Sequence, residues 1–188
     1  MNEKRLMKIV ITNQQKQIRV HSARLRRLAA WLMEQAVGGS SCSRARGREA
    51  PPTKQLSNMR WHGVSALLTD DTGIVVANQA VFGRDYVTDV ISLTYPPLPG
   101  ETGWNGELII NVELAASEGA RRAGGPDREL ALYLAHGCDH LAGADDATPR
   151  QRATMHCREL RWLRAAARAG LLTGIFLPQS SPRKEKTR

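Results

Sequence analysis

His136 and His140 have the spacing and the chemistry of a metal-binding pair. Side chains four positions apart on an α-helix lie on the same face, one turn from each other. Gly143 follows three residues later and can take the left-handed conformation that ends a helix. If the chain turns back there, the carboxylate of Asp146 approaches the two imidazoles. Two imidazole nitrogens and one carboxylate oxygen are a common ligand set for catalytic zinc, with a fourth position left for water.

A His-x-x-x-His pair can also be two ordinary histidines on a helix surface or in a core. The glycine and the acid that follow at short spacing favour the metal interpretation. Residues 128–135 support it, because they are good helix formers with apolar side chains on one face. We therefore predict a metal site formed by His136, His140 and Asp146.

The residue after the first histidine restricts the reaction class. Zinc peptidases of the His-Glu-x-x-His type place a general-base glutamate there, whereas this chain has Gly137, which cannot accept a proton. Asp139 and Asp145 are nearby carboxylates, but Asp139 should point away from the face that carries the histidines. A peptidase is therefore disfavoured, and a hydrolase that relies on metal-activated water stays open, phosphodiester cleavage being one example.

The composition fits one domain of 188 residues with a core of Leu, Ile, Val and Ala, since aromatic residues make up only 5%. No apolar run approaches the roughly 20 residues that span a bilayer, and the N-terminus lacks the features of a signal peptide. Three cysteines without paired spacing are typical of reduced thiols, and we expect Cys138 to be a buried thiol rather than a ligand. We expect a cytoplasmic protein that does not contact membranes.

The net charge of +9 is distributed unevenly along the chain. Residues 1–60 contain 13 Lys and Arg against 3 Asp and Glu, residues 61–149 contain 4 against 13, and residues 150–188 contain 10 against 2. Basic ends around an acidic centre favour contact with a polyanion. The alternative is that the ends are solvated tails, which we favour for residues 181–188; the arginine-rich helix at 150–168 is the better candidate for phosphate contact.

Hydrophobic periodicity and turn signals predict the secondary structure. Strands are expected over 7–12, 61–68, 87–94 and 107–111, and helices over 22–37, 74–81 and 112–123. Residues 124–127 (GGPD) should break the chain and cap the metal helix, and Thr148 or Asp146 should cap a last helix that runs to about Ala169. Residues 38–58 are predicted to form a flexible insertion in a domain over 1–175, with a basic tail over 176–188.

Four segments carry a family resemblance: TDVISL at residues 88–93, GELII at 106–110, HGCDHLAGAD at 136–145 and MHCRELRWL at 155–163. In this order they resemble the YbeY-type metal-dependent endoribonucleases, also described as ribosomal RNA maturation factors. The family's signature is His-Gly-x-Leu-His-Leu-x-Gly-Tyr-Asp-His, so the third segment is the most specific. The likeness covers about residues 7–37 and 59–170.

The resemblance implies a single α+β domain, with a small mixed four-stranded sheet, surrounding helices and a zincin-like metal helix that holds one zinc. It also implies cleavage of single-stranded RNA, 3′-end maturation of ribosomal RNA and ribosome quality control. The expected partners are therefore single-stranded or ribosomal RNA and the small ribosomal subunit.

Two departures from the family pattern bear on the site. Asp146 stands where the family has its third histidine, and a carboxylate oxygen is acceptable to zinc but makes the bound water less acidic. Phe82 stands where the family often has an arginine that could steady phosphate charge. Arg84 lies two residues away and is a candidate for that role, although it could equally pair with Asp85 or Asp89.

Two functions from different classes remain open at this point. The first is a metalloenzyme in which zinc activates water against RNA and basic flanks hold the strand. The second is a ribosome-associated RNA-binding factor with a structural zinc and little or no cleavage, which Phe82 in place of arginine favours.

Overall fold

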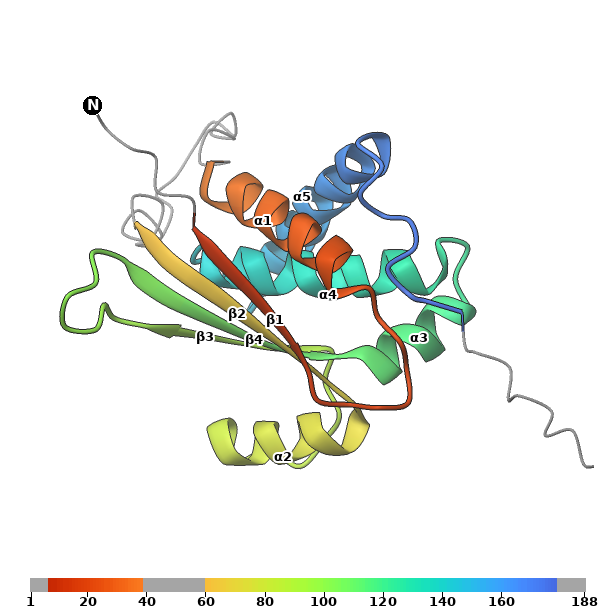
Figure 1. The fold of residues 1–188 in the computed structure, drawn as a ribbon, viewed down its shortest axis with the longest axis horizontal. Coiled ribbons are helices and arrows are strands. Elements are labelled where there is room, and N and C mark those ends of the chain that lie inside the picture. The colour runs from red at the N-terminus through yellow and green to blue at the C-terminus, as the bar shows by residue number, and fades with distance from the viewer. Residues whose placement is uncertain (1–6, 39–59, 179–188) are drawn as a thin grey trace, which may run out of the picture.

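Four strands form one mixed sheet in the computed structural model, which describes residues 7–38 and 60–178 (Figure 1). The strand order is β1-β2-β4-β3; β1, β2 and β4 run parallel, and β3 is antiparallel to β4. The elements are β1 (Lys8–Asn13), α1 (Ser22–Gly38), β2 (Trp61–Thr69), α2 (Asp71–Phe82), β3 (Val90–Tyr95), β4 (Trp104–Asn111), α3 (Val112–Ala120), α4 (Gly125–Leu141) and α5 (Pro149–Arg168). The predicted α+β class with a four-stranded mixed sheet is confirmed.

The two faces of the sheet pack against different helices because successive strand residues point to opposite sides. Leu108 and Ile110 of β4 belong to the main core, which α1 and α4 complete. Ile109 lies on the other face and packs with Ile74 of α2 in a smaller core. In Figure 1, α2 lies on the side of the sheet opposite to α1 and α4, so the metal helix and α2 are separated by the sheet.

Several predicted boundaries shift for identifiable reasons. Residues 87–89 were expected in the third strand, but β3 begins at Val90, whose amide donates to the side chain of Asp89. The strand expected from residue 107 begins at Trp104, which pairs with Trp61 of β2. The helix expected over 74–81 starts at Asp71, because the carboxylate of Asp70 accepts the amide of Gly73 and caps it.

The start of α4 differs in detail from the prediction. The break at residues 124–127 is present, with Gly125 at a φ of 69°, but no side chain caps the helix. The carboxylate of Asp127 instead accepts the amides of Gly174 and Phe176, both at 2.7 Å. Phe176 also forms a β-bridge with Val20. The packed chain therefore continues past residue 175, where the sequence placed the end of the domain.

The remaining predictions on chain organisation fall on parts that the structure does not describe. Of the predicted insertion at 38–58, Gly38 ends α1 and the rest lies outside the described residues, as does Cys42. The predicted basic tail lies outside them from residue 179. Within the described ranges, none of the helices is both long enough and apolar enough to cross a membrane.

A close approach between α4 and the sheet sets the position of the metal helix. A Cβ atom at Gly137 would lie 2.8 Å from a methyl carbon of Leu108 and 3.1 Å from one of Val90, so a larger residue would have to displace these packed side chains. The other side of α4 packs against α5, whose N-terminus has the capping box of Thr148 and Gln151. The metal helix is thus held between the β3–β4 edge and α5.

Candidate metal centre

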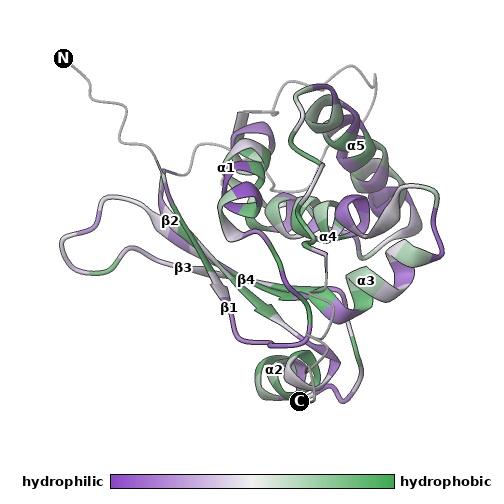
Figure 2. Ribbon diagram, turned by 45° about the vertical axis from the view of Figure 1, so that its right-hand side comes forward, coloured by the Kyte–Doolittle hydropathy of each residue, from purple (hydrophilic) through white to green (hydrophobic). Residues whose placement is uncertain are grey.

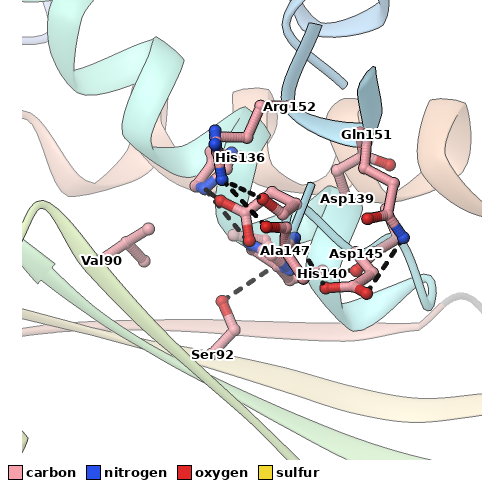
Figure 3. Close-up of polar contacts among 12 residues, drawn as sticks. Val90, Ser92, His136, Asp139, His140, Asp145, Ala147, Gln151 and Arg152 are labelled. Atoms are coloured by element: carbon pink, nitrogen blue, oxygen red, sulfur yellow. Dashed lines mark hydrogen bonds and ion pairs between the residues drawn. The ribbon is translucent and has the colours of Figure 1, made fainter. Parts of the chain in front are cut away.

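The two histidines of α4 direct their ring nitrogens toward each other (Figure 3). Their Nε2 atoms are 3.1 Å apart, and the ring centroids are 4.5 Å apart with the planes nearly perpendicular. This is the arrangement that the spacing of four residues predicts for one helical face.

Asp146 completes the group from the loop that follows α4. The helix ends at Leu141, and Gly143 adopts a φ of 91°, so the chain turns back as its sequence suggests. The two carboxylate oxygens of Asp146 each lie 3.9 Å from one Nε2 atom of the pair. The structure therefore brings together His136, His140 and Asp146, with one ligand atom of each within 4.8 Å of the others.

The outer nitrogens of both rings are bonded to acceptors. Nδ1 of His136 lies 2.8 Å from a carboxylate oxygen of Glu159, and Nδ1 of His140 lies 3.0 Å from the carbonyl oxygen of Ala144. Because a carboxylate or carbonyl oxygen only accepts, each Nδ1 must carry the proton. The neutral rings then present two lone pairs to each other and to the carboxylate of Asp146, an arrangement that a cation stabilises.

The donor set fits a zinc ion. Ligand bonds of about 2.0–2.1 Å in a tetrahedral site separate ligand atoms by roughly 3.3 Å. The distance between the two Nε2 atoms is 3.1 Å, and the distances to the Asp146 oxygens are 3.9 Å. The side chain of Asp146 is 38% exposed, so it has room to close the small remaining gap. Two nitrogens and one oxygen leave a fourth position for water or substrate.

Glu159 is the strongest charged influence on His136. Burial alone would lower the pKa of His136, but the hydrogen bond and negative charge of Glu159 raise that pKa above its usual value. The charges of Asp89 and Asp146 act in the same direction. Glu159 is only 3% exposed, so its carboxylate is largely shielded from solvent.

The other nearby acidic and thiol groups are used elsewhere. Asp139 accepts two hydrogen bonds from the guanidinium of Arg158, at 2.6 and 2.8 Å, which agrees with its expected direction away from the histidine face. Burial raises the pKa of the Asp139 carboxyl, and Arg158 offsets part of this shift. Asp145 bonds the side chain of Gln151. Cys138 is buried and unpaired, as predicted, and burial raises its pKa.

A cleft of about 430 Å³ opens beside the histidines. Its walls come from α4, α5, the loop between them, the turn after α3 and the residue before β3, and they include His136, Asp146 and Glu159. Two arginines line it. Arg122 is paired with Glu118 and Glu129, whereas Arg152 donates to the backbone oxygens of Asp146 and Ala147 and has no carboxylate partner among the described residues (Figure 3).

Arg84, the arginine proposed from the sequence, lies in the loop after α2 and does not line this cleft. Its guanidinium is 5.6 Å from the ring centroid of Phe82 and bonds the hydroxyl of Tyr86. Neither Asp85 nor Asp89 forms an ion pair with it in the part of the chain that the structure describes. A role for Arg84 toward phosphate stays a prediction.

Sequence reasoning did not assign roles to two residues of the site, Glu159 and Arg152. A signal for Glu159 was present, because it is an acidic residue on the stripe formed by Met155 and Leu163, which is otherwise apolar and faces α4. No sequence feature distinguished Arg152, because it is one of several arginines on α5. Arg152 reaches the site only because the turn after α4 brings the start of α5 close to Asp146.

Comparison with known proteins gives the family. A sequence model described as Endoribonuclease YbeY matches residues 10–167. The chain belongs to the YbeY family. An Endoribonuclease YbeY from an Anaeromyxobacter strain is 32% identical over 149 residues, which cover 79% of this chain and 75% of the relative.

Two further curated YbeY relatives match over shorter regions. The relative from Elusimicrobium minutum is 36% identical over 94 residues, and the one from Rhodopirellula baltica is 36% identical over 123 residues. These matches cover 49% and 63% of this chain, and they span 66% and 57% of the relatives' own lengths.

The fold has a solved counterpart. The solution structure of a protein from Thermotoga maritima superposes with a TM-score of 0.51 and 21% sequence identity. The superposition covers 94% of this chain and 99% of the other. At that identity the likeness concerns the fold, and it agrees with the α+β arrangement described above.

Proposed function

We propose that this protein is a zinc-dependent endoribonuclease that cuts single-stranded RNA. The observation that carries the proposal is the convergence of His136, His140 and Asp146, whose histidines direct unprotonated nitrogens to one point beside an open cleft. Family membership supports RNA as the substrate. By the same likeness we assign the protein to 3′-end maturation of ribosomal RNA and to ribosome quality control at the small subunit in the cytoplasm.

The residues around the site have separable tasks. Bound zinc supplies Lewis acidity, which polarises a phosphodiester and acidifies water. Glu159 and the carbonyl of Ala144 fix the protonation of the two histidine ligands. Arg152, which pairs with no carboxylate among the described residues, presents a positive charge to the cleft, where a guanidinium suits the growing negative charge of a phosphate in reaction.

The packing of Gly137 argues against a peptidase. A side chain at this position would have to displace Leu108 and Val90, which disfavours a general-base glutamate there. The exposed face of α5 instead carries arginines that suit a polyanion, including Arg150, Arg164 and Arg168.

A cleavage assay on single-stranded RNA tests the proposal. Protein as purified should contain about one zinc per chain and cut the strand; chelation should stop cleavage, and added zinc should restore it. His140→Ala should lose both metal and cleavage. His62→Ala is the matched control, because His62 lies on β2 beside Glu101 and away from the cleft, and it should retain both. Full metal content in His140→Ala would overturn the assignment.

The second candidate is an RNA-binding factor with a structural zinc. The exchange of the family's arginine for Phe82, together with the position of Arg84 outside the cleft, favours it. In that case, the zinc-loaded protein would bind the strand and leave it intact at every zinc concentration. Metal loss in His140→Ala would then lower the melting temperature, with no cleavage to lose.

A further inference from the structure

Exposed aromatic side chains gather where α2 ends and the loop toward β3 begins. The chain has only 2 Phe, 3 Tyr and 4 Trp. Phe82 is 50% exposed and Tyr86 is 53% exposed, and Tyr95 is the third exposed aromatic residue. Two rings of this rare type are therefore held in solvent within five residues, although burying them would have stabilised the fold.

Arg84 lies between the two rings. Its guanidinium carbon is 5.6 Å from the centroid of the Phe82 ring, and Nη1 donates to the hydroxyl of Tyr86 at 3.2 Å. It forms no ion pair with a carboxylate among the described residues. The three side chains thus combine two flat apolar faces with a positive charge that pairs with none of the described carboxylates.

Two buried asparagines fix this loop. The amide of Asn78, which is 2% exposed, donates to the carbonyl of Tyr86 at 2.9 Å. The amide of Asn111, which is fully buried, donates to the carbonyl of Thr88 at 3.3 Å. The rings are therefore presented by an anchored backbone, so little conformational entropy is lost when a ligand binds to them.

The loop leads directly to the metal centre. Asp89 lines the cleft, and its charge acts on the ring of His136. Asp89 lies three positions after Tyr86, so their Cα atoms are at most roughly 11 Å apart. A nucleic-acid strand that places a phosphodiester in the cleft can reach the rings with the next few nucleotides.

We propose that Phe82, Arg84 and Tyr86 form a stacking site for an unpaired nucleobase of the RNA strand, next to the nucleotides bound in the cleft. This inference rests on the proposed function. Proteins hold single strands by stacking bases on aromatic rings and guanidinium planes, which requires bases that are not paired in a duplex. The site would give the cleft a preference for single-stranded RNA without a preference for sequence.

A protein partner is the competing occupant, because Val76 and Val81 on α2 are exposed as well and α2 is largely hydrophobic (Figure 2). An apolar protein surface over these rings would bury the charge of Arg84 without a carboxylate, which is costly. A nucleobase can stack on the rings, and its phosphate can pair with the charge of Arg84. The residues therefore favour RNA.

The test measures binding of a short single-stranded RNA, with poorly hydrolysed phosphorothioate linkages, to the zinc-loaded full chain by fluorescence anisotropy. Phe82→Ala and Tyr86→Ala should each weaken binding about tenfold. Tyr86→Phe keeps the ring and should bind as the parent does. Val76→Ala is the matched control, since Val76 is 64% exposed on the same helix, and it should leave binding unchanged.

The affinity for an RNA strand with abasic sites is a second measurement, and a purely structural role of the rings would not affect it. The parent protein should bind the abasic strand about as weakly as Phe82→Ala binds the normal strand, and the variant should not distinguish the two strands. Equal affinity of parent and Phe82→Ala/Tyr86→Ala for normal RNA would overturn the stacking site and leave the surface to a protein. Ring-dependent binding together with no cleavage of an unmodified strand by the zinc-loaded protein would instead reject only the proposed enzyme activity.

Discussion

Two polar contacts join the same pair of helices, α4 and α5, and only one of them reaches the cleft. His136 bonds Glu159 at 2.8 Å, and three residues further along α4 Asp139 bonds Arg158 at 2.6 Å. Each contact pairs an acid that is 3% exposed in its side chain with a partner that is about one quarter exposed. Burial and pairing are therefore nearly the same in the two contacts.

The two contacts differ in whether they leave a ligand atom free to face the cleft. The bond to Glu159 uses one ring nitrogen of His136 and leaves Nε2 directed at His140 and Asp146. Asp139 and Arg158 are outside the cleft, where Arg158 also lies over the ring of Trp162. A buried ion pair is thus weak support for function by itself; the free donor atom that faces the cleft is the informative feature.

The largest expected effect comes from changing the contact between His136 and Glu159, which reaches the cleft. His136→Ala should reduce the zinc content from about one per chain to near zero, because a three-residue site that loses a nitrogen ligand retains only two. Metal analysis after gel filtration measures this. His156→Ala is a useful comparison, since His156 lines the same cleft but lies outside the ligand group, and zinc retained in His136→Ala would refute the site.

The second prediction concerns the contact between Asp139 and Arg158. Asp139→Ala leaves Arg158 without its carboxylate partner and should lower the free energy of unfolding by roughly 2–4 kcal/mol, somewhat less than for a fully buried pair because Arg158 reaches solvent. Zinc content should stay near one per chain. Denaturant unfolding measures the loss, and Asp139→Leu combined with Arg158→Leu should recover most of it. A drop in zinc affinity in Asp139→Ala would erase the distinction between the two contacts.

Glu159→Gln should have a moderate effect. The amide oxygen still accepts from Nδ1 of His136, but the negative charge behind the ring is lost. We expect zinc affinity to fall by about 10–100-fold, with the melting temperature of the metal-free protein little changed. Competition with a chelator of known affinity measures the loss, and unchanged affinity would show that the carboxylate has no influence on the metal.

The smallest expected effect is a dependence of zinc affinity on pH. The pKa of His136 is raised in the folded protein, so protonation of this ring contributes stability at low pH, and that contribution is lost as pH rises through the raised pKa. Zinc requires the neutral ring, so its affinity should fall about tenfold per pH unit below that pKa. Chelator competition between pH 5 and 8 measures the slope, and Glu159→Gln should move its onset to lower pH; an onset that does not move contradicts this assignment.

The sequence by itself was sufficient for features that depend on neighbours along the chain. The shared face of His136 and His140 follows from helical geometry, and the turn that returns Asp146 follows from Gly143. The order of most strands and helices along the chain also follows from hydrophobic patterns and turn signals, whereas the α+β class followed from the resemblance of four segments to the YbeY family. Element ends shifted: those of β3 and β4 because pairing across the sheet sets them, and the start of α2 because the side chain of Asp70 caps it.

Only the tertiary structure decided which distant side chains meet. Glu159 lies 23 residues from His136 and reaches it because α5 packs against α4. Arg152 rather than Arg84 lines the cleft because the turn after α4 brings the start of α5 back over the ligands. Local periodicity fixes which residues share a face, but the packing of two helices determines what lies opposite that face, and this depends on the whole core.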